Sequence, residues 1–291
     1  VGTTATPKLD IELRTKRENI SAGFSKLLGP GFDFQVRFRN EEKDGSRAYG
    51  VYGPGPHFLA EPINWTTRQW EATLGYTSDR FQFTGGYHGS SYDNGNPRLN
   101  LLGTGFTFTP SFMALPPSNQ AHQFHAAGGY SFTPTTRGTF KVAYARATQD
   151  EAFNIATFGG QTSLDGRVDT TLLQFGLSGR PVPRLSLRAD VRYEDRDDQT
   201  ARAQYISALS TTRNGFNNPR SLRSIKGKIE ASYLLPAGIR LTGGVERDER
   251  ERSVPALRSV PFREDTADTT YRVELRRSIS ETLNGAVALV H

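Results

Sequence analysis

The sequence predicts an all-β protein whose antiparallel strands run up and down and close into a transmembrane β-barrel. Three observations carry this prediction. Apolar side chains recur at every second position in about twelve segments, tight turns alternate with long polar loops, and the intervening positions are rich in charge. Successive side chains of a β-strand point to opposite faces, so period two is the period of a strand. We therefore expect one apolar face and one polar face throughout.

The segment 32–39 shows the alternation most clearly. Its odd and even positions separate into an apolar set (Phe32, Phe34, Val36, Phe38) and a polar set (Asp33, Gln35, Arg37, Arg39). A helix, at about 100° per residue, would scatter both sets. The other apolar rows are Ile20 to Phe24, Trp70 to Tyr76, Phe81 to Tyr87, Phe124 to Tyr130, Phe140 to Tyr144, Leu173 to Leu177, Leu185 to Tyr193, Ile225 to Tyr233, Ile239 to Val245, Tyr271 to Leu275 and Leu283 to Leu289.

The connections between these rows alternate in length. The short ones have the Gly, Pro, Asp and Thr residues of tight turns and lie at 29–31, 78–80, 133–136, 180–184, 236–238 and 280–282. We expect long loops at 43–62, 91–121, 147–167, 195–222 and 249–267. Turns at one edge and loops at the other are typical of outer-membrane barrels. We therefore expect residues 1–291 to form a single barrel domain of six hairpins, each about 50 residues long.

Composition excludes several classes of protein. The 291 residues include no Cys, which excludes a disulfide scaffold, a thiolate zinc site and covalent haem attachment. No apolar run approaches the roughly 20 residues of a membrane-spanning helix. The net charge of +6 is spread along the chain without a Lys/Arg-rich run, so we expect no nucleic-acid partner.

Tyrosines close the apolar rows at both ends. Amphipathic rings of this kind prefer the two membrane interfaces, so the sequence predicts two lipid-facing girdles. The girdle residues are Tyr76, Tyr130 and Tyr233 beside the short turns, and Tyr87, Tyr144 and Tyr193 toward the long loops.

The opposite face carries dense charge of both signs, which suits a watery lumen or a polar partner. The lumen-facing candidates for partner contact are Arg37, Arg39, Glu71, Arg188, Asp190, Arg192, Glu230, Arg240, Glu246, Arg272, Glu274 and Arg276. One interpretation is solvation of a wide pore by ion-paired walls, in which each exposed pair contributes about 0–1 kcal/mol. The other is a complementary surface that docks and orients a partner protein.

Three groups of residues could indicate a metal site or a catalytic site. His122 and His125 point to opposite faces of a strand, so they cannot hold one metal ion together. The segment 88–91 (His-Gly-Ser-Ser) suggests a hydrolase, but we find no third group to orient the base. Asp93, Asn94 and Asn96 could bind calcium in a loop or simply form an Asn-Gly turn. We therefore expect no enzyme activity and no metal site beyond this calcium candidate.

Several segments between and along the strands resemble a known family. They are Glu41 to Gly45, Ala114 to Gln123, Ser131 to Arg137, Thr148 to Phe153, Ser163 to Thr171 and Tyr193 to Asp198. In this order and spacing they resemble the MtrB/PioB family of decahaem-associated outer-membrane proteins, over about residues 16–290. The Leu-Pro-Pro-x-Asn-Gln and Thr-Gln-Asp-Glu-Ala-Phe elements are specific only in combination.

The resemblance implies a barrel in the Gram-negative outer membrane that sheathes a periplasmic multihaem (decahaem) c-type cytochrome. The cytochrome in the lumen would carry electrons across the membrane, with an extracellular multihaem cytochrome as a further partner. The barrel itself would bind no cofactor, and haem c would belong to the partner.

Family barrels have strand numbers in the mid-twenties, about twice what this chain supplies. The chain also lacks the N-terminal region in which some members carry a Cys-x-x-Cys. We therefore expect it to be an internal portion of a larger barrel. The alternative is a diffusion porin or transporter that closes at twelve strands, since barrels have even strand numbers from 8 upward.

Overall fold

The computed structural model describes residues 12–52, 56–100, 112–154, 160–205, 215–254, 263–278 and 284–291, and these residues are almost entirely β-structure. One sheet contains twelve strands, as the alternation predicts. They are β1 (Thr15–Gly29), β2 (Phe32–Tyr52), β3 (Pro56–Thr77), β4 (Phe81–Asn94), β7 (Asn119–Thr133), β8 (Thr136–Gln149), β9 (Gly166–Val182), β10 (Leu185–Asp198), β13 (Leu222–Leu234), β14 (Ile239–Arg252), β15 (Asp265–Ser278) and β16 (Asn284–Val290).

The topology is up-and-down throughout. Every strand of the sheet is antiparallel to its neighbour, in the order β1-β2-β3-β4-β7-β8-β9-β10-β13-β14-β15-β16. Two small hairpins lie outside the sheet at its loop end, β5 (Arg98–Asn100) with β6 (Phe112–Ala114) and β11 (Gln204–Tyr205) with β12 (Gly215–Phe216). The all-β, up-and-down architecture is therefore as predicted.

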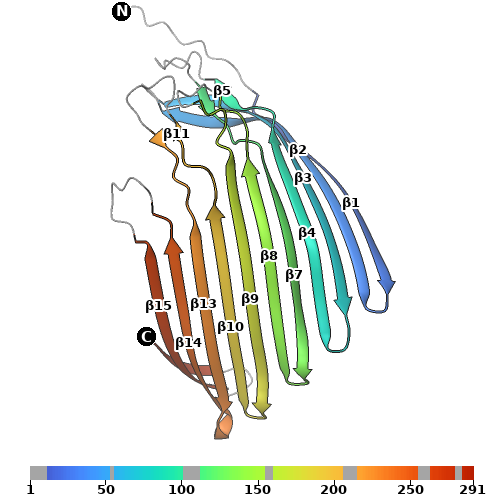
Figure 1. Ribbon diagram of the computed structural model, residues 1–291, viewed down its shortest axis with the longest axis vertical. Coiled ribbons are helices and arrows are strands. Elements are labelled where there is room, and N and C mark those ends of the chain that lie inside the picture. Colours follow the sequence, from blue (N-terminus) through green and yellow to red (C-terminus); the bar gives the residue numbers. More distant parts are fainter. Residues whose placement is uncertain are drawn as a thin grey trace, which may run out of the picture.

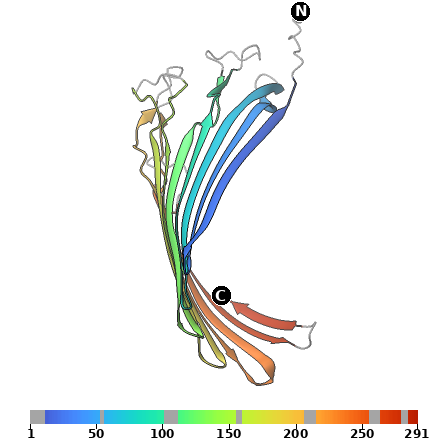
Figure 2. The same cartoon turned by 90° about the vertical axis from the view of Figure 1, so that its right-hand side faces the viewer.

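The sheet is a single curved layer. Figure 1 shows the hairpins displaced stepwise along the strand direction, and Figure 2 shows both ends of the sheet curving toward the same side. In the described part of the chain β1 pairs only with β2 and β16 only with β15, so the sheet is an open trough with two free edges.

The strand register separates the two faces as the sequence predicts. One row across five strands runs Val36, Ala72, Tyr87, Phe124 and Tyr144, each residue directly opposite the next. Directly paired residues of an antiparallel sheet point to the same face. The apolar rows of all twelve strands thus form one continuous face, and the charged positions form the other.

The five predicted short connections that fall within the described residues lie where they were predicted. Strand β1 turns into β2 at Pro30 and Gly31, where φ of +79° suits glycine. Residues 236–238 form a 3-10 turn, η1 (Pro236–Gly238), in place of a plain tight turn. The predicted turn at 280–282 lies outside the described residues.

The predicted loop at 43–62 is wrong. Strands β2 and β3 continue through it as one long ladder, paired from Lys43 opposite Trp65 up to Tyr52 opposite Pro56. Charged and Gly residues gave this segment the composition of a loop, but cross-strand pairing satisfies its backbone. The other long connections are present, although β10 and β14 extend into them as far as Asp198 and Arg252.

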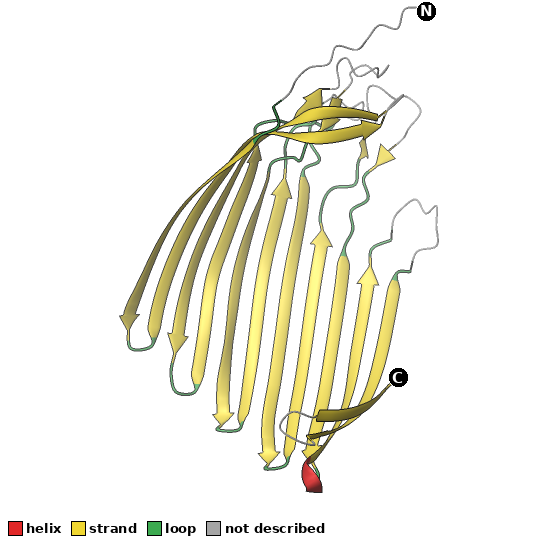
Figure 3. Cartoon of the chain, turned by 180° about the vertical axis from the view of Figure 1, so that it is seen from behind, coloured by secondary structure: helices red, strands yellow, loops and turns green. Residues whose placement is uncertain are grey.

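The extended β2–β3 hairpin bends over the concave side of the sheet at its loop end (Figure 3). Gly45 lies on β2 within this hairpin; its φ is +124°, and a Cβ there would collide with the carbonyl oxygen of Arg14. The described residues that are almost fully buried gather mostly at this end, and they include Glu61, Ile63, Asn94, Leu99 and Leu115. Among the described residues, no second layer covers the rest of the sheet.

Large apolar side chains instead remain exposed along the sheet. Five of them, each between 51% and 74% exposed, are Phe124, Phe175, Ile229, Val273 and Leu289. No helix in the described ranges is long and apolar enough to cross a membrane.

Candidate lumen surface

Every predicted lumen residue lies on the polar face, which is the concave one. The register connects Arg37 to Glu71, Arg188 to Glu230, and Arg240 to Arg276 as directly opposed neighbours. The other six candidates lie an even number of positions from one of these residues on the same strand, so they share this face. They are Arg39, Asp190, Arg192, Glu246, Arg272 and Glu274.

Ion pairs connect most of these charges across and along the strands. Arg188 contacts Asp190 at 2.6 Å, Lys228 contacts Glu230 at 3.1 Å, and Lys226 contacts Glu246 at 2.6 Å. Arg272 and Arg276 both contact Glu274, whereas the Arg37–Glu71 pair is looser at 3.8 Å. The basic partners of these pairs are exposed to solvent, so each pair contributes little to stability. The wall is thus strongly polar and nearly neutral over most of its area.

A groove of about 870 Å³ lies on this face near the short turns, between β8 and β15. Six arginines and two glutamates line it: Arg137, Arg180, Arg188, Arg240, Arg272, Arg276, Glu230 and Glu274. Sequence reasoning missed Arg180, which was counted with the turn at 180–184, and Arg137, which directly follows the turn at 133–136. Their parity with Ser131 and Ser178 on neighbouring strands would have placed them on the lumen face.

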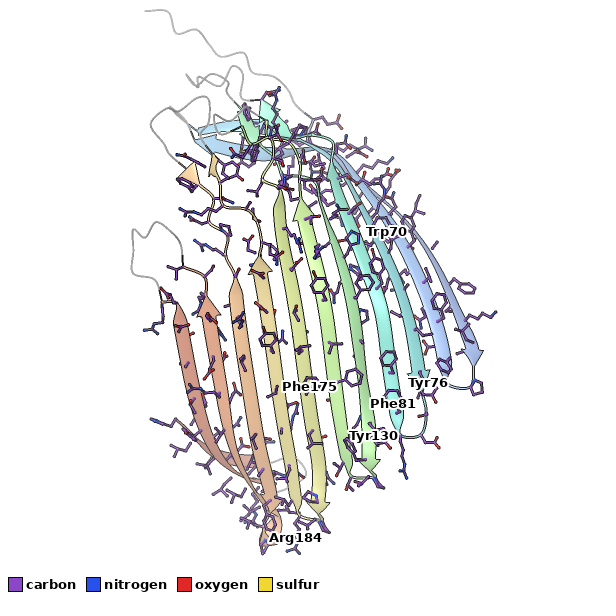
Figure 4. The ribbon with its side chains drawn as sticks, in the orientation of Figure 1. Trp70, Tyr76, Phe81, Tyr130, Phe175 and Arg184 are labelled. Atoms are coloured by element: carbon purple, nitrogen blue, oxygen red, sulfur yellow. The ribbon has the colours of Figure 1, made fainter. Side chains whose placement is uncertain are left out.

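The convex face carries the predicted tyrosine girdles. Trp70, Tyr76, Phe81, Tyr130 and Phe175 lie on the face turned toward the viewer in Figure 4, which is the convex one in Figure 2. Near the turns the Tyr76 ring lies 4.5 Å from the ring of Phe32 and 6.1 Å from that of Phe81.

The second tyrosine row lies toward the loops. Tyr87 packs 5.1 Å from Phe124, and its hydroxyl is 2.7 Å from Nδ1 of His122. Tyr144 and Tyr193 close the rows on β8 and β10, and Tyr233 closes its row at the turn end of β13. All six predicted girdle residues therefore share the apolar face.

Charge returns on the convex face immediately beyond the loop-side tyrosines. Arg68 contacts Asp93 at 2.8 Å, Arg146 contacts Asp169 at 2.8 Å, and Arg223 contacts Asp195 at 3.6 Å. An apolar band bounded by aromatic rows and then by ion pairs matches the profile of a lipid-facing surface. The apolar band thus ends at the loop-side tyrosines.

The histidine and serine candidates are separated or unconnected. His122 lies on the convex face and His125 on the concave face, as their spacing predicts. His88 lies opposite Glu71, an acidic neighbour that the sequence did not reveal. However, Glu71 pairs with Arg37, and no hydrogen bond between described residues connects His88 with Ser90 or Glu71. The geometry provides no nucleophile–base pair.

The calcium candidates each have a structural role. Asp93 contacts Arg68 on the convex face. Asn94 is buried; its side-chain amide donates to the carbonyl of Pro116, and its Oδ1 accepts the N–H of Asn96. Asn94 thus closes an Asx-type turn, and the described residues include no cluster of three or more His, Asp or Glu side chains suited to a metal ion.

Comparison with known proteins identifies the family. The sequence of residues 1–291 matches the outer membrane beta-barrel porin family MtrB/PioB. The outer membrane protein MtrB of Shewanella baltica (strain OS185) is 28% identical over 256 residues, which are 82% of this chain and 36% of that protein. The chain therefore spans about a third of the length of this curated relative.

Two solved structures have a similar chain course at low sequence identity. The first is the outer membrane transporter YddB of Escherichia coli. The matched region is 90% of this chain and 38% of YddB, with a TM-score of 0.46 and 14% identity. The second is BauA, the ferric preacinetobactin receptor of Acinetobacter baumannii. The matched region is 94% of this chain and 46% of BauA, with a TM-score of 0.47 and 14% identity. The family match extends over the whole chain, which includes the apolar band and the polar wall described above. The chain belongs to the MtrB/PioB family of outer-membrane β-barrel proteins.

Proposed function

We propose that this chain is part of a barrel that sheathes a multihaem c-type cytochrome and so forms an electron conduit across the outer membrane. The observation that carries the proposal is the polar face. Charged side chains cover it from the groove near the turns to the buried Glu61 at the loop end. A wall of this kind must face water or a polar protein, because unpaired charge against apolar atoms is costly.

The open sheet supports a barrel larger than twelve strands. Within the described residues β1 and β16 leave their outer edges unpaired, and exposed strand edges template further pairing. The curated relative is almost three times as long as the matched region, which leaves ample chain for further strands. A wider barrel would have room for a folded protein in its lumen, since barrel diameter grows with strand number.

The composition of the chain indicates which protein would carry the haem. With no Cys this chain cannot attach haem c, so the haem would be carried by the partner. The barrel would hold that partner in a polar tunnel and separate it from lipid by the apolar band. An extracellular multihaem cytochrome would complete the path at the loop side.

The test is a visible absorption spectrum of the complex, isolated through this protein from detergent-solubilised outer membranes. We expect a Soret band and reducible c-type haem at about ten haems per barrel, all of it attached to a second polypeptide. A colourless preparation from cells that express the cytochrome would contradict the proposal.

The second candidate function is diffusion through an empty lumen. The family description as a porin and the ion-paired, hydrated wall favour it. Single-channel conductance of the full-length protein in planar bilayers separates the two. A porin conducts as isolated, whereas a sheath conducts only after its haem protein has been removed.

A further inference from the structure

The groove near the short turns has more positive charge than its surroundings can neutralise. Six arginines and two glutamates line it. Glu274 is shared by Arg272 and Arg276, and Glu230 is already contacted by Lys228. Arg188 contacts the carboxylate of Asp190 at 2.6 Å, which lies outside the lining of the groove. The groove therefore retains a positive excess where the rest of the wall is close to balanced.

Three of the guanidinium groups have no acidic partner among the described residues. Arg137 donates to Oε1 of Gln82 at 2.7 Å, and Arg240 donates to the hydroxyl of Ser232 at 3.4 Å. Arg180 lines the groove, and its side chain has no hydrogen bond or ion pair to another described residue. Elsewhere on this face Arg39, Arg192 and Arg250 each contact a carboxylate at 2.6 to 2.8 Å. Arg137, Arg180 and Arg240 thus bring three guanidinium groups without a carboxylate partner into one groove.

The position of these arginines suits an extended partner. They come from three separate hairpins, on β8, β9 and β14, and all lie on the concave side close to the turns. A groove of about 870 Å³ is large enough for several side chains and too open to enclose a small ion. A guanidinium presents a planar fork of donors that matches a carboxylate, so several of them favour a surface with several carboxylates.

We propose that this groove binds a cluster of acidic side chains on the protein held in the lumen, and so fixes its position at the turn end of the barrel. The proposal rests on the proposed function, because it takes the occupant of the lumen to be a protein. Arg137, Arg180 and Arg240 are the residues that would accept the new carboxylates. Charge complementarity of this kind sets orientation and specificity more than affinity.

The test compares two triple variants of the full-length protein. R137Q/R180Q/R240Q removes three unpaired lumen charges, and R68Q/R223Q/R247Q removes three charges from the convex face, where each already has a carboxylate partner. A third variant, R137K/R180K/R240K, keeps the charge. Heat-modifiable mobility in SDS gels shows that each variant has folded.

The probe is a fluorescent hexaglutamate peptide, titrated into barrels purified from cells that lack the haem protein. We expect the lumen variant to bind it about tenfold more weakly than the unaltered protein, since three exposed guanidinium–carboxylate contacts are lost. The convex-face variant should bind as the unaltered protein does, and the lysine variant should keep most of the affinity. Equal binding by the lumen variant would overturn the inference.

A parallel measurement separates this inference from the proposed function. Complexes isolated from cells that express the haem protein are washed with increasing salt, and the retained Soret absorbance is recorded. If the unaltered protein retains haem and the lumen variant binds hexaglutamate normally, the groove inference fails and the sheath stands. If the unaltered protein brings no haem but binds hexaglutamate through the three arginines, the sheath fails and an anion site remains.

Discussion

Arg47 holds Glu61 in a two-pronged ion pair across the extended β2–β3 hairpin. Nε and Nη2 of Arg47 each donate to the carboxylate of Glu61 at 2.8 Å, and Glu61 is only 1% exposed. The guanidinium of Arg47 also lies 5.5 Å from the centre of the Trp65 ring. This pair is the most deeply buried charge contact described, and it anchors the bent part of the hairpin over the loop-side end of the trough.

Replacing Glu61 by Gln should loosen this bent hairpin. The change removes the charge that balances Arg47 in a buried setting, and we expect it to destabilise the hairpin by about 1–3 kcal/mol. Limited proteolysis of the detergent-solubilised protein should then cleave within 46–60 faster than in the unaltered protein. Glu71→Gln is the matched control, because its 3.8 Å pair with Arg37 is exposed. Equal protease sensitivity of the two variants would show that the Arg47 pair does not hold the hairpin.

Gly45 should be intolerant of any side chain. Its φ of +124° disfavours L-residues, and an added Cβ would meet the backbone of Arg14 and Thr15. We expect Gly45→Ala to cost about 1–3 kcal/mol and to straighten the hairpin. The measurement is the temperature at which the folded band is lost in SDS gels. Gly243→Ala is the control, since a Cβ at Gly243 meets nothing within 4 Å; a similar loss in both variants would mean that Gly45 is not the cause.

The faces of this fold could be predicted from sequence because a strand has a strict period of two. Once Phe32 to Arg39 is recognised as a strand, each side chain is assigned to lipid or lumen, and antiparallel pairing carries the same assignment across the sheet. The six girdle tyrosines and the twelve lumen candidates follow from this rule. The number of strands follows from the number of apolar rows.

The cross-strand partners could not be predicted in the same way. The segment 43–47 has the composition of a loop. Only the register of the structure shows that Arg47 lies opposite Glu61. The residues between the paired Tyr52 and Pro56 read Gly-Pro-Gly, which is a turn signal, but the prediction included them in a single long loop. The groove was missed for a related reason, because it joins residues from four hairpins that are far apart along the chain.

A charge placed in the middle of the apolar band should be far more costly than the loss of a charge from the lumen wall. Ile229 is 67% exposed on the convex face, four residues from Tyr233 and four from Ile225 on β13. We expect Ile229→Arg to destabilise the folded barrel by about 2–4 kcal/mol, the cost of a cation at the bilayer midplane. Lys228→Ser, its neighbour on the lumen face, should cost about 1 kcal/mol or less. Urea unfolding in lipid vesicles measures both, and similar costs would mean that the faces are wrongly assigned.

Asp198 at the loop end of β10 should titrate below the usual range of an aspartate. Burial would raise its pKa, but the hydrogen bonds from Thr200 and from the backbone N–H of Arg220 outweigh burial, and the pKa of Asp198 is lowered. Because the folded pKa is the lower one, the carboxylate stabilises the loop above the unfolded value of about 4, and this contribution is lost as pH falls through the folded pKa. The residue lies beyond the apolar band, where solvent reaches it.

Amide proton shifts of Thr200 and Arg220 report this titration by NMR. We expect both to move together, with a midpoint below pH 4, because both amides donate to the same carboxylate. In Asp198→Asn neither amide should move, and protease cleavage in the connection after β10 should be faster at neutral pH than in the unaltered protein. A midpoint above pH 4 in the unaltered protein would mean that burial, and not the hydrogen bonds, controls this carboxyl group.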